Sequence, residues 1–114
     1  LGFVEVEELK WLYLNSKGLV MPTFLGPTNM PVLEAAYLGC PVSCSDLKGH
    51  REQLGNYANY FNPESYSEIS QSIKKMLKEN TKGKQLNNKF RVEDTILKLQ
   101  EAFDEISGIR NSWK

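Results

Sequence analysis

The sequence predicts an α/β fold in which a doubly wound parallel sheet is flanked by helices. Short apolar runs over 19–21, 41–44 and 58–61 have the composition of buried strands. Segments with helical periodicity lie between them, and strands that alternate with helices along a chain predict a parallel sheet. Such sheets bind ligands at the carboxyl ends of their strands, so the loops at those ends are the first places to search for a site.

The first half of the chain predicts two helices and two strands. Apolar residues at helical spacing predict the first helix, which stops before Gly18: Val6, Leu9, Leu12 and Tyr13. The run 19–21 predicts a strand that Pro22 closes, and a loop over 23–29 follows. The next helix is expected over 30–38, because Pro31 suits a first turn and Gly39 a helix end. A second strand is expected over 41–44.

The second half continues the alternation. One or two helical turns are expected over 49–54 and a third strand over 58–61. Ser65 and Glu68 have capping-box spacing. The helix that they start is expected to bury four apolar residues: Ile69, Ile73, Met76 and Leu77. After a polar stretch over 80–89, a last helix is expected to carry four apolar residues on one face: Ile96, Leu99, Phe103 and Ile106. Residues 81–114 are expected to form a C-terminal helical extension within one partial domain, 1–114.

Composition excludes several classes of protein. With 40% hydrophobic and 25% charged residues, the chain of 114 residues is typical of one soluble domain or part of one. The 14 basic and 14 acidic residues argue against a nucleic-acid binder. No apolar run approaches the roughly 20 residues of a membrane span. The first residues lack the features of a signal peptide and an initiator Met, which suggests a piece of a longer chain.

The two cysteines, Cys40 and Cys44, are expected to be small buried apolar side chains in a reducing cytosol. In an extended segment that spacing holds the two Cα atoms too far apart for a disulfide. Two thiols without a nearby histidine or further cysteine are also a poor metal site, so no metal and no cofactor are expected.

The most informative segment is the loop over 26–29 with the helix that follows it. Backbone N–H groups at a helix start attract anions, and the segment carries one carboxylate, Glu34, expected in the first turn. A carboxylate accepts hydrogen bonds from hydroxyls. A ligand with both phosphate and sugar hydroxyls, such as a nucleotide-sugar, therefore suits this segment, which leaves the carboxyl end of a predicted strand.

Residues 1–80 resemble the C-terminal part of the group 1 retaining glycosyltransferases, which have the Rossmann-like GT-B fold. The strongest motif is Pro31-Val32-Leu33-Glu34-Ala35 followed by Gly39-Cys40-Pro41-Val42, and weaker matches precede and follow it: Gly2, Glu8-Leu9, Leu12-Tyr13, Pro22, Glu52, Gly55, Phe61 and Pro63. The resemblance implies that Glu34 binds the ribose hydroxyls of the donor nucleotide. It also implies that a backbone loop holds the diphosphate and the donor sugar, here Gly26, Pro27, Thr28, Asn29 and Met30.

The chain departs from the family pattern in two ways. The family usually has another glutamate eight positions before the one that matches Glu34. In this chain that position is Gly26. The loop is similar to a variant in which the hydroxyl of Thr28 and the amide of Asn29 take over contacts to sugar or phosphate. The basic Arg–Lys pair for the diphosphate and the N-terminal acceptor domain both belong upstream of this chain in the family. The resemblance therefore implies that this fragment alone is inactive, and no catalytic residue is assigned within it.

Each of these residues also has a structural interpretation. In this interpretation Glu34 interacts with the helix dipole and has no ligand, and Thr28 or Asn29 is the helix N-cap. Gly26 and Pro27 are turn formers. His50 is expected at a solvated helix start rather than as a general base, and Glu52 is expected to be a surface or capping residue.

The segment 74–91 contains seven basic residues and a single acidic residue, Glu79. A solvated face is the favoured interpretation. Contact with an anionic membrane surface is the alternative, and it suits an enzyme that uses a lipid-linked acceptor.

These observations predict a cytoplasmic hexosyltransferase fragment, peripheral to the inner membrane face if the basic segment contacts lipid. Its partners are then a nucleotide-diphosphate sugar and the N-terminal acceptor domain of the same protein, with a glycan or lipid-linked acceptor in cell-surface polysaccharide synthesis. The alternative is a non-catalytic αβ binding or assembly module derived from the same fold. A phosphate-sugar isomerase is disfavoured, because no acid/base pair is evident.

Overall fold

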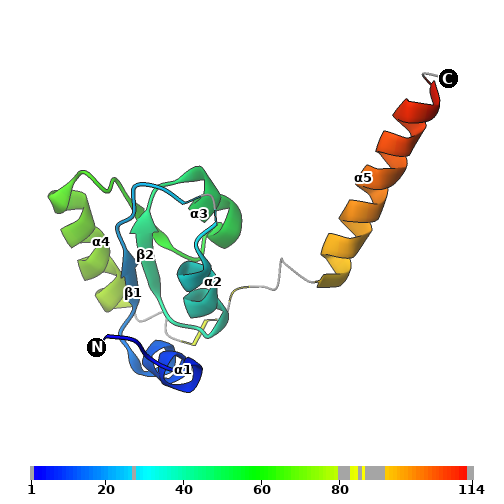
Figure 1. Ribbon diagram of the computed structural model, residues 1–114. Helices are drawn as coiled ribbons and strands as arrows, with labels where there is room; N and C mark the ends of the chain where they lie inside the picture. The colour runs from blue at the N-terminus through cyan, green and yellow to red at the C-terminus, as the bar shows by residue number, and fades with distance from the viewer. Residues whose placement is uncertain (1, 27, 80–82, 85, 87–91, 113–114) are drawn as a thin grey trace.

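The computed structural model describes residues 2–26, 28–79, 83–84, 86 and 92–112. These residues form helices and strands in alternation (Figure 1): α1 (Val6–Asn15), β1 (Leu19–Met21), α2 (Met30–Tyr37), β2 (Val42–Ser45), α3 (Lys48–Leu54), β3 (Asn59–Phe61), α4 (Tyr66–Glu79) and α5 (Val92–Ser112). All the elements expected from the sequence are present, and most of their ends agree with expectation within one residue.

The three strands form one parallel sheet in the order β1-β2-β3. Leu19 pairs with Val42, and Ser45 pairs with Phe61. Helices α2 and α3 cover one face of the sheet and α4 covers the other (Figure 1). The predicted α/β class and the parallel sheet with flanking helices are therefore confirmed. All three strands end at the same edge, and the loops that follow β1 and β2 meet there.

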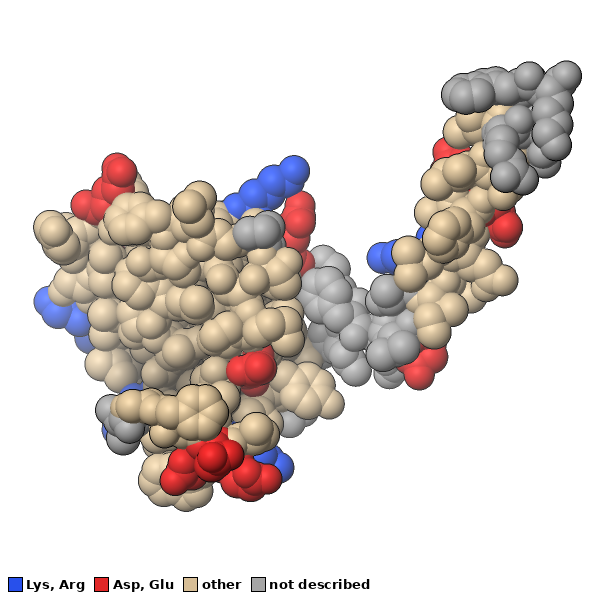
Figure 2. All heavy atoms as spheres, in the orientation of Figure 1, with Lys and Arg blue, Asp and Glu red and all other residues tan. Residues whose placement is uncertain are grey.

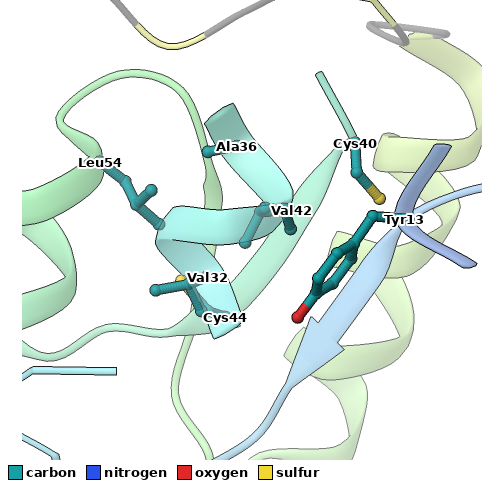
Figure 3. Close-up of a cluster of buried hydrophobic side chains, with 8 residues drawn as sticks. Tyr13, Val32, Ala36, Cys40, Val42, Cys44 and Leu54 are labelled. Atoms are coloured by element: carbon teal, nitrogen blue, oxygen red, sulfur yellow. The ribbon is translucent and has the colours of Figure 1, made fainter. Parts of the chain in front are cut away.

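The core lies between α2 and the central strand. Val32, Ala35 and Ala36 of α2 are completely buried, and every residue of β2 is buried as well. Figure 3 shows Leu54 of α3 on one side of this cluster and Tyr13 of α1 on the other. A strand buried on both faces reads as a continuous run rather than an alternating one, which is why the period-2 signal is absent here.

The cysteines agree with expectation. Cys40 and Cys44 are both free thiols, with exposed fractions of 1% and 0%. Burial raises the pKa of the Cys44 thiol to about 12, and nearby Asp46 adds to the effect. These side chains act as small apolar core residues.

Two expectations about α4 are wrong in part. Met76 is buried and Ile69 and Ile73 are half-buried, but Leu77 is 52% exposed. Ser72 is buried in its place, where its hydroxyl lies 2.5 Å from that of Ser43 on β2. The capping box is only half formed. The Glu68 N–H donates to Ser65 Oγ, but the Glu68 carboxylate accepts from the N–H of Asn62 instead.

The last helix is longer than any other, and Figure 1 shows it projecting away from the sheet and its helices. The large apolar side chains from Ile96 to Ile109 are exposed by about half or more, including all four that the sequence places on one face: Ile96, Leu99, Phe103 and Ile106. The proposed boundary at residue 81 lies outside the described residues, so the division into domain and extension stays a prediction.

Charged side chains do not form one basic surface on the face shown in Figure 2, where basic residues are scattered and acidic ones gather over α1. Of the predicted basic segment, Lys82, Lys89 and Arg91 lie outside the described residues. Lys75 on α4 forms an ion pair with Glu79 at 3.7 Å. Among the described residues, no helix has the length and apolar character needed to cross a membrane.

Candidate functional site

The candidate site lies where β1 ends and the following loop enters α2. Pro31 stands near the start of α2, and Asn29 occupies the N-cap position. Gly26 has φ +151°, a conformation that L side chains rarely adopt. Pro27, which was expected to contribute to this loop, lies outside the described residues. The structure thus places Gly26, Thr28, Asn29 and Met30 together at the carboxyl edge of the sheet.

Glu34 lies on α2 one turn later than expected. The first turn of α2 carries no acidic residue, because the helix begins at Met30 and Glu34 is its fifth residue. Its side chain is half-buried. The Tyr13 hydroxyl of α1 donates to Glu34 Oε2 at 3.1 Å. Glu34 therefore does not act mainly on the helix dipole, whose effect falls off within the first turn.

Tyr13 contacts the candidate site, although the sequence indicated it only as part of the apolar spacing of the first helix. It is 8% exposed, and burial raises its pKa to about 12, with the hydrogen bond to Glu34 as the second cause. The hydroxyl is thus kept protonated and able to donate. Because Tyr13 and Glu34 are 21 residues apart, only the packing of α1 against α2 brings them together.

His50 contradicts the expectation of a solvated helix start. It is completely buried on α3. Its Nδ1 lies 2.7 Å from the carbonyl oxygen of Ser45, and its Nε2 lies 2.5 Å from the Asn29 Nδ2 atom. The Asn29 side chain consequently makes no capping hydrogen bond to α2, although Asn29 is the N-cap residue. The charged neighbours Lys48, Arg51 and Glu52 made this position look exposed, and helix α3 turns His50 away from all three.

The rest of the loop presents exposed side chains. Thr28 and Met30 are exposed, and so are Phe24 and Leu25, at 63% and 87%. Thr23 Oγ1 accepts from the N–H of Leu25 at 3.2 Å and donates to the Leu25 carbonyl oxygen, which folds the first part of the loop back on itself. The apolar pair at 24–25 had no signal in the sequence beyond its composition.

Two further polar groups frame the neighbouring β2–α3 loop. Arg51 forms a two-pronged ion pair with Asp46 and stacks over the ring of Tyr60, with 4.5 Å between the guanidinium carbon and the ring centre. The guanidinium holds the pKa of Asp46 below its usual value. Glu52 is exposed, as expected, and lies 4.0 Å from Lys48. The part of the chain that the structure describes contains no group of three or more potential metal ligands.

Comparison with known proteins shows to which family the chain belongs. The model of the family described as glycosyl transferases group 1 matches residues 1–92. The chain belongs to this family. Among curated proteins, it is 32% identical over 81 residues to the O-antigen chain mannosyltransferase B of Escherichia coli. That match covers 71% of this chain but 21% of the relative, so the chain spans about a fifth of that protein's length. No solved structure matches significantly.

Membership in the group 1 glycosyltransferases agrees with the resemblance that the Pro31–Ala35 and Gly39–Val42 motifs carry. In the structure, the first motif forms most of α2, and the second forms the turn from α2 into β2. The first motif therefore directly follows the loop over 26–29 and carries Glu34, whereas the second lies at the other end of α2. The roles of the individual residues are taken up as proposals below.

Proposed function

We propose that this chain is part of the nucleotide-binding domain of a retaining GT-B glycosyltransferase that uses a nucleotide-diphosphate sugar. Glu34 carries this proposal. The chain belongs to the group 1 glycosyltransferases, and Tyr13 of α1 holds the Glu34 carboxylate beside the carboxyl edge of the sheet, where such folds bind ligands. Its Oε2 accepts from Tyr13, which leaves Oε1 and the second lone pair of Oε2 to accept from ribose hydroxyls.

The loop before α2 is proposed to hold the diphosphate and the sugar. The first N–H groups of a helix have no partner within it, and they favour anions. In glycosyl transfer, negative charge builds on the leaving diphosphate as the glycosidic bond breaks, and oriented N–H donors stabilise that charge. Glu34 would fix the ribose and thereby the register of the diphosphate against the loop.

The similarity to an O-antigen mannosyltransferase supports a role in the synthesis of a cell-surface polysaccharide. It also makes GDP-mannose the first donor to test. Acceptor binding and the Arg–Lys pair for the diphosphate are proposed to come from the part of the protein that precedes this chain. The fragment alone is therefore expected to be inactive, without a metal or cofactor of its own, and to act at the cytoplasmic side of a membrane.

The test is Glu34→Gln and Glu34→Ala in the complete protein, with calorimetric titration of GDP and UDP. Each variant is expected to weaken the binding of the preferred nucleotide at least tenfold, since two charge-assisted hydrogen bonds are lost. Glu7→Gln, an exposed carboxylate on α1, is the matched control and should leave affinity unchanged. Unchanged nucleotide affinity in a folded Glu34→Ala protein would refute the assignment. If the parent protein binds no nucleotide, the non-catalytic module becomes the better explanation.

A further inference from the structure

His50 connects the two loops that meet at the ligand-binding edge. The Ser45 carbonyl oxygen, at the end of β2, can only accept a hydrogen bond, so His50 Nδ1 carries the hydrogen. The Asn29 amide nitrogen can only donate, so Nε2, which lies 2.5 Å from it, is the acceptor of this bond. The buried ring thus joins the end of β2 to the residue that precedes α2.

This bond decides which way the Asn29 amide is turned. An amide has a donor end, Nδ2, and an acceptor end, Oδ1. Because an Nε2 acceptor can receive only from Nδ2, His50 fixes Oδ1 as the atom of the amide that remains to accept. Sugar hydroxyls are donors that an acceptor oxygen can bind. The carboxylate that the family usually has eight positions before Glu34 is likewise an acceptor.

Gly26 stands at that family position, and a side chain there would meet the Asn29 amide. A Cβ atom at Gly26 would lie 2.6 Å from Asn29 Oδ1 and 2.7 Å from Asn29 Cγ, closer than Cβ atoms approach other atoms. The positive φ of Gly26 disfavours a side chain independently. The Asn29–His50 pair and a side chain at position 26 therefore exclude each other. The amide occupies the space that the first atoms of a glutamate would need.

We propose that His50 is the positioning residue for the sugar contact that the family resemblance gives to Asn29, because it orients the amide so that Oδ1 is the atom that accepts from a donor-sugar hydroxyl. The ligand class is a nucleotide-diphosphate hexose with a free hydroxyl facing this loop. This proposal rests on the proposed function and adds to it the group that distinguishes the sugar from the bare nucleotide. Gly26, Asn29 and His50 form one unit, which we call the amide anchor.

Two substitutions of His50 separate its two hydrogen bonds. His50→Asn places an amide nitrogen near the position of Nδ1, so it keeps the bond to Ser45 and loses the one to Asn29. His50→Gln reaches the position of Nε2 with an oxygen, so it keeps the acceptor for Asn29 and loses the bond to Ser45. Both variants remove the ring, and the shorter Asn leaves the larger void, so Asn29→Ala, which keeps the His50 ring in place, controls for the damage to packing.

The measurement is the affinity of the complete protein for GDP-mannose and for GDP, with UDP-glucose and UDP as the second pair. His50→Asn and Asn29→Ala are expected to weaken binding of the nucleotide-sugar about tenfold, the worth of one well-formed hydrogen bond, while affinity for the nucleoside diphosphate changes less than about twofold. His50→Gln is expected to stay within about threefold of the parent for both ligands.

Equal losses in His50→Asn and His50→Gln, or equal losses for nucleotide-sugar and nucleoside diphosphate, would overturn the proposal and leave His50 a purely structural residue. If neither His50 variant folds, Gly26→Ala answers the same question, because its methyl group displaces the Asn29 amide while the His50 ring remains. A sugar-specific loss supports the amide anchor, and an unchanged nucleotide-sugar affinity refutes it. Glu34 variants measured in parallel distinguish failure of this proposal from failure of the proposed function. A nucleotide affinity that does not change in the Glu34 variants refutes the proposed function itself.

Discussion

The hydrogen bond between Tyr13 and Glu34 gives the sharpest prediction about how the fold supports the site. Tyr13→Phe removes one oxygen and leaves the ring in the core, where Tyr13 is 8% exposed. The lost bond, at 3.1 Å, is made to a carboxylate. Hydrogen bonds to charged groups contribute about 1.5–3 kcal/mol when buried. Glu34 is only half-buried and water can replace the hydroxyl, so the direct loss lies near the lower end.

Part of that loss is expected to appear in nucleotide affinity. Without Tyr13, the Glu34 side chain must be ordered when ribose binds, which costs about 0.5–1.5 kcal/mol for one side chain. The dissociation constant for the preferred nucleoside diphosphate should therefore rise about threefold to tenfold in Tyr13→Phe. Calorimetric titration of the complete protein measures it, and Tyr66→Phe, an exposed tyrosine at the start of α4, is the matched control.

A double-mutant cycle decides whether the effect passes through Glu34. If Tyr13 acts by orienting the carboxylate, Tyr13→Phe should change affinity little in a Glu34→Ala background, and the coupling energy should be about 1 kcal/mol. A threefold to tenfold loss of affinity in both backgrounds would refute the reasoning and make Tyr13 a core residue only.

Two further predictions concern protonation and burial. Burial raises the pKa of Tyr13, Tyr57 and Tyr60 to about 12 from the ordinary value of 10.0, so the folded state keeps protons that the unfolded state loses. These three tyrosines should therefore leave stability unchanged with pH below about pH 10. Their contribution should fall as the pH rises from 10 to 12 and level off above that. The thermal unfolding midpoint against pH should be flatter over this range in Tyr13→Phe than in Tyr66→Phe, and equal slopes in the two variants would contradict the account. Cys44, which is fully buried with a raised pKa, should resist a thiol reagent at mildly alkaline pH until denaturant is added, as mass spectrometry of the labelled peptide would show; rapid labelling of the native protein would be inconsistent with this packing.

The alternation of elements could be predicted from the sequence because its signals are local. Pro22 and Gly39 end segments whatever surrounds them, and the apolar runs of β1 and β2 are too short and too continuous for amphipathic helices. The strand ends were less certain. The second strand is one residue later than expected, at Val42–Ser45, because Ser45 pairs with Phe61 of β3, a contact that the local sequence does not contain.

The errors have a common origin in packing between distant segments. Leu77 was expected in the core from its spacing along α4, but α4 faces the sheet with Ser72 and Met76 instead. His50 was expected in water from its charged neighbours, yet α3 packs on α2 and buries it. Periodicity shows that a helix has two faces, but the neighbouring elements decide which residues are covered.

By itself, the sequence determined that this chain alternates short strands with helices, that it carries the group 1 glycosyltransferase motifs and that Glu34 and the Gly26–Asn29 loop are the candidate ligand groups. Only the tertiary structure decided how these groups are held. Tyr13 reaches Glu34 and His50 reaches Asn29 across 21 residues of chain in each case. The physical reason is that motif spacing records which residues are available, while hydrogen-bond direction and burial depend on side chains that the fold brings together.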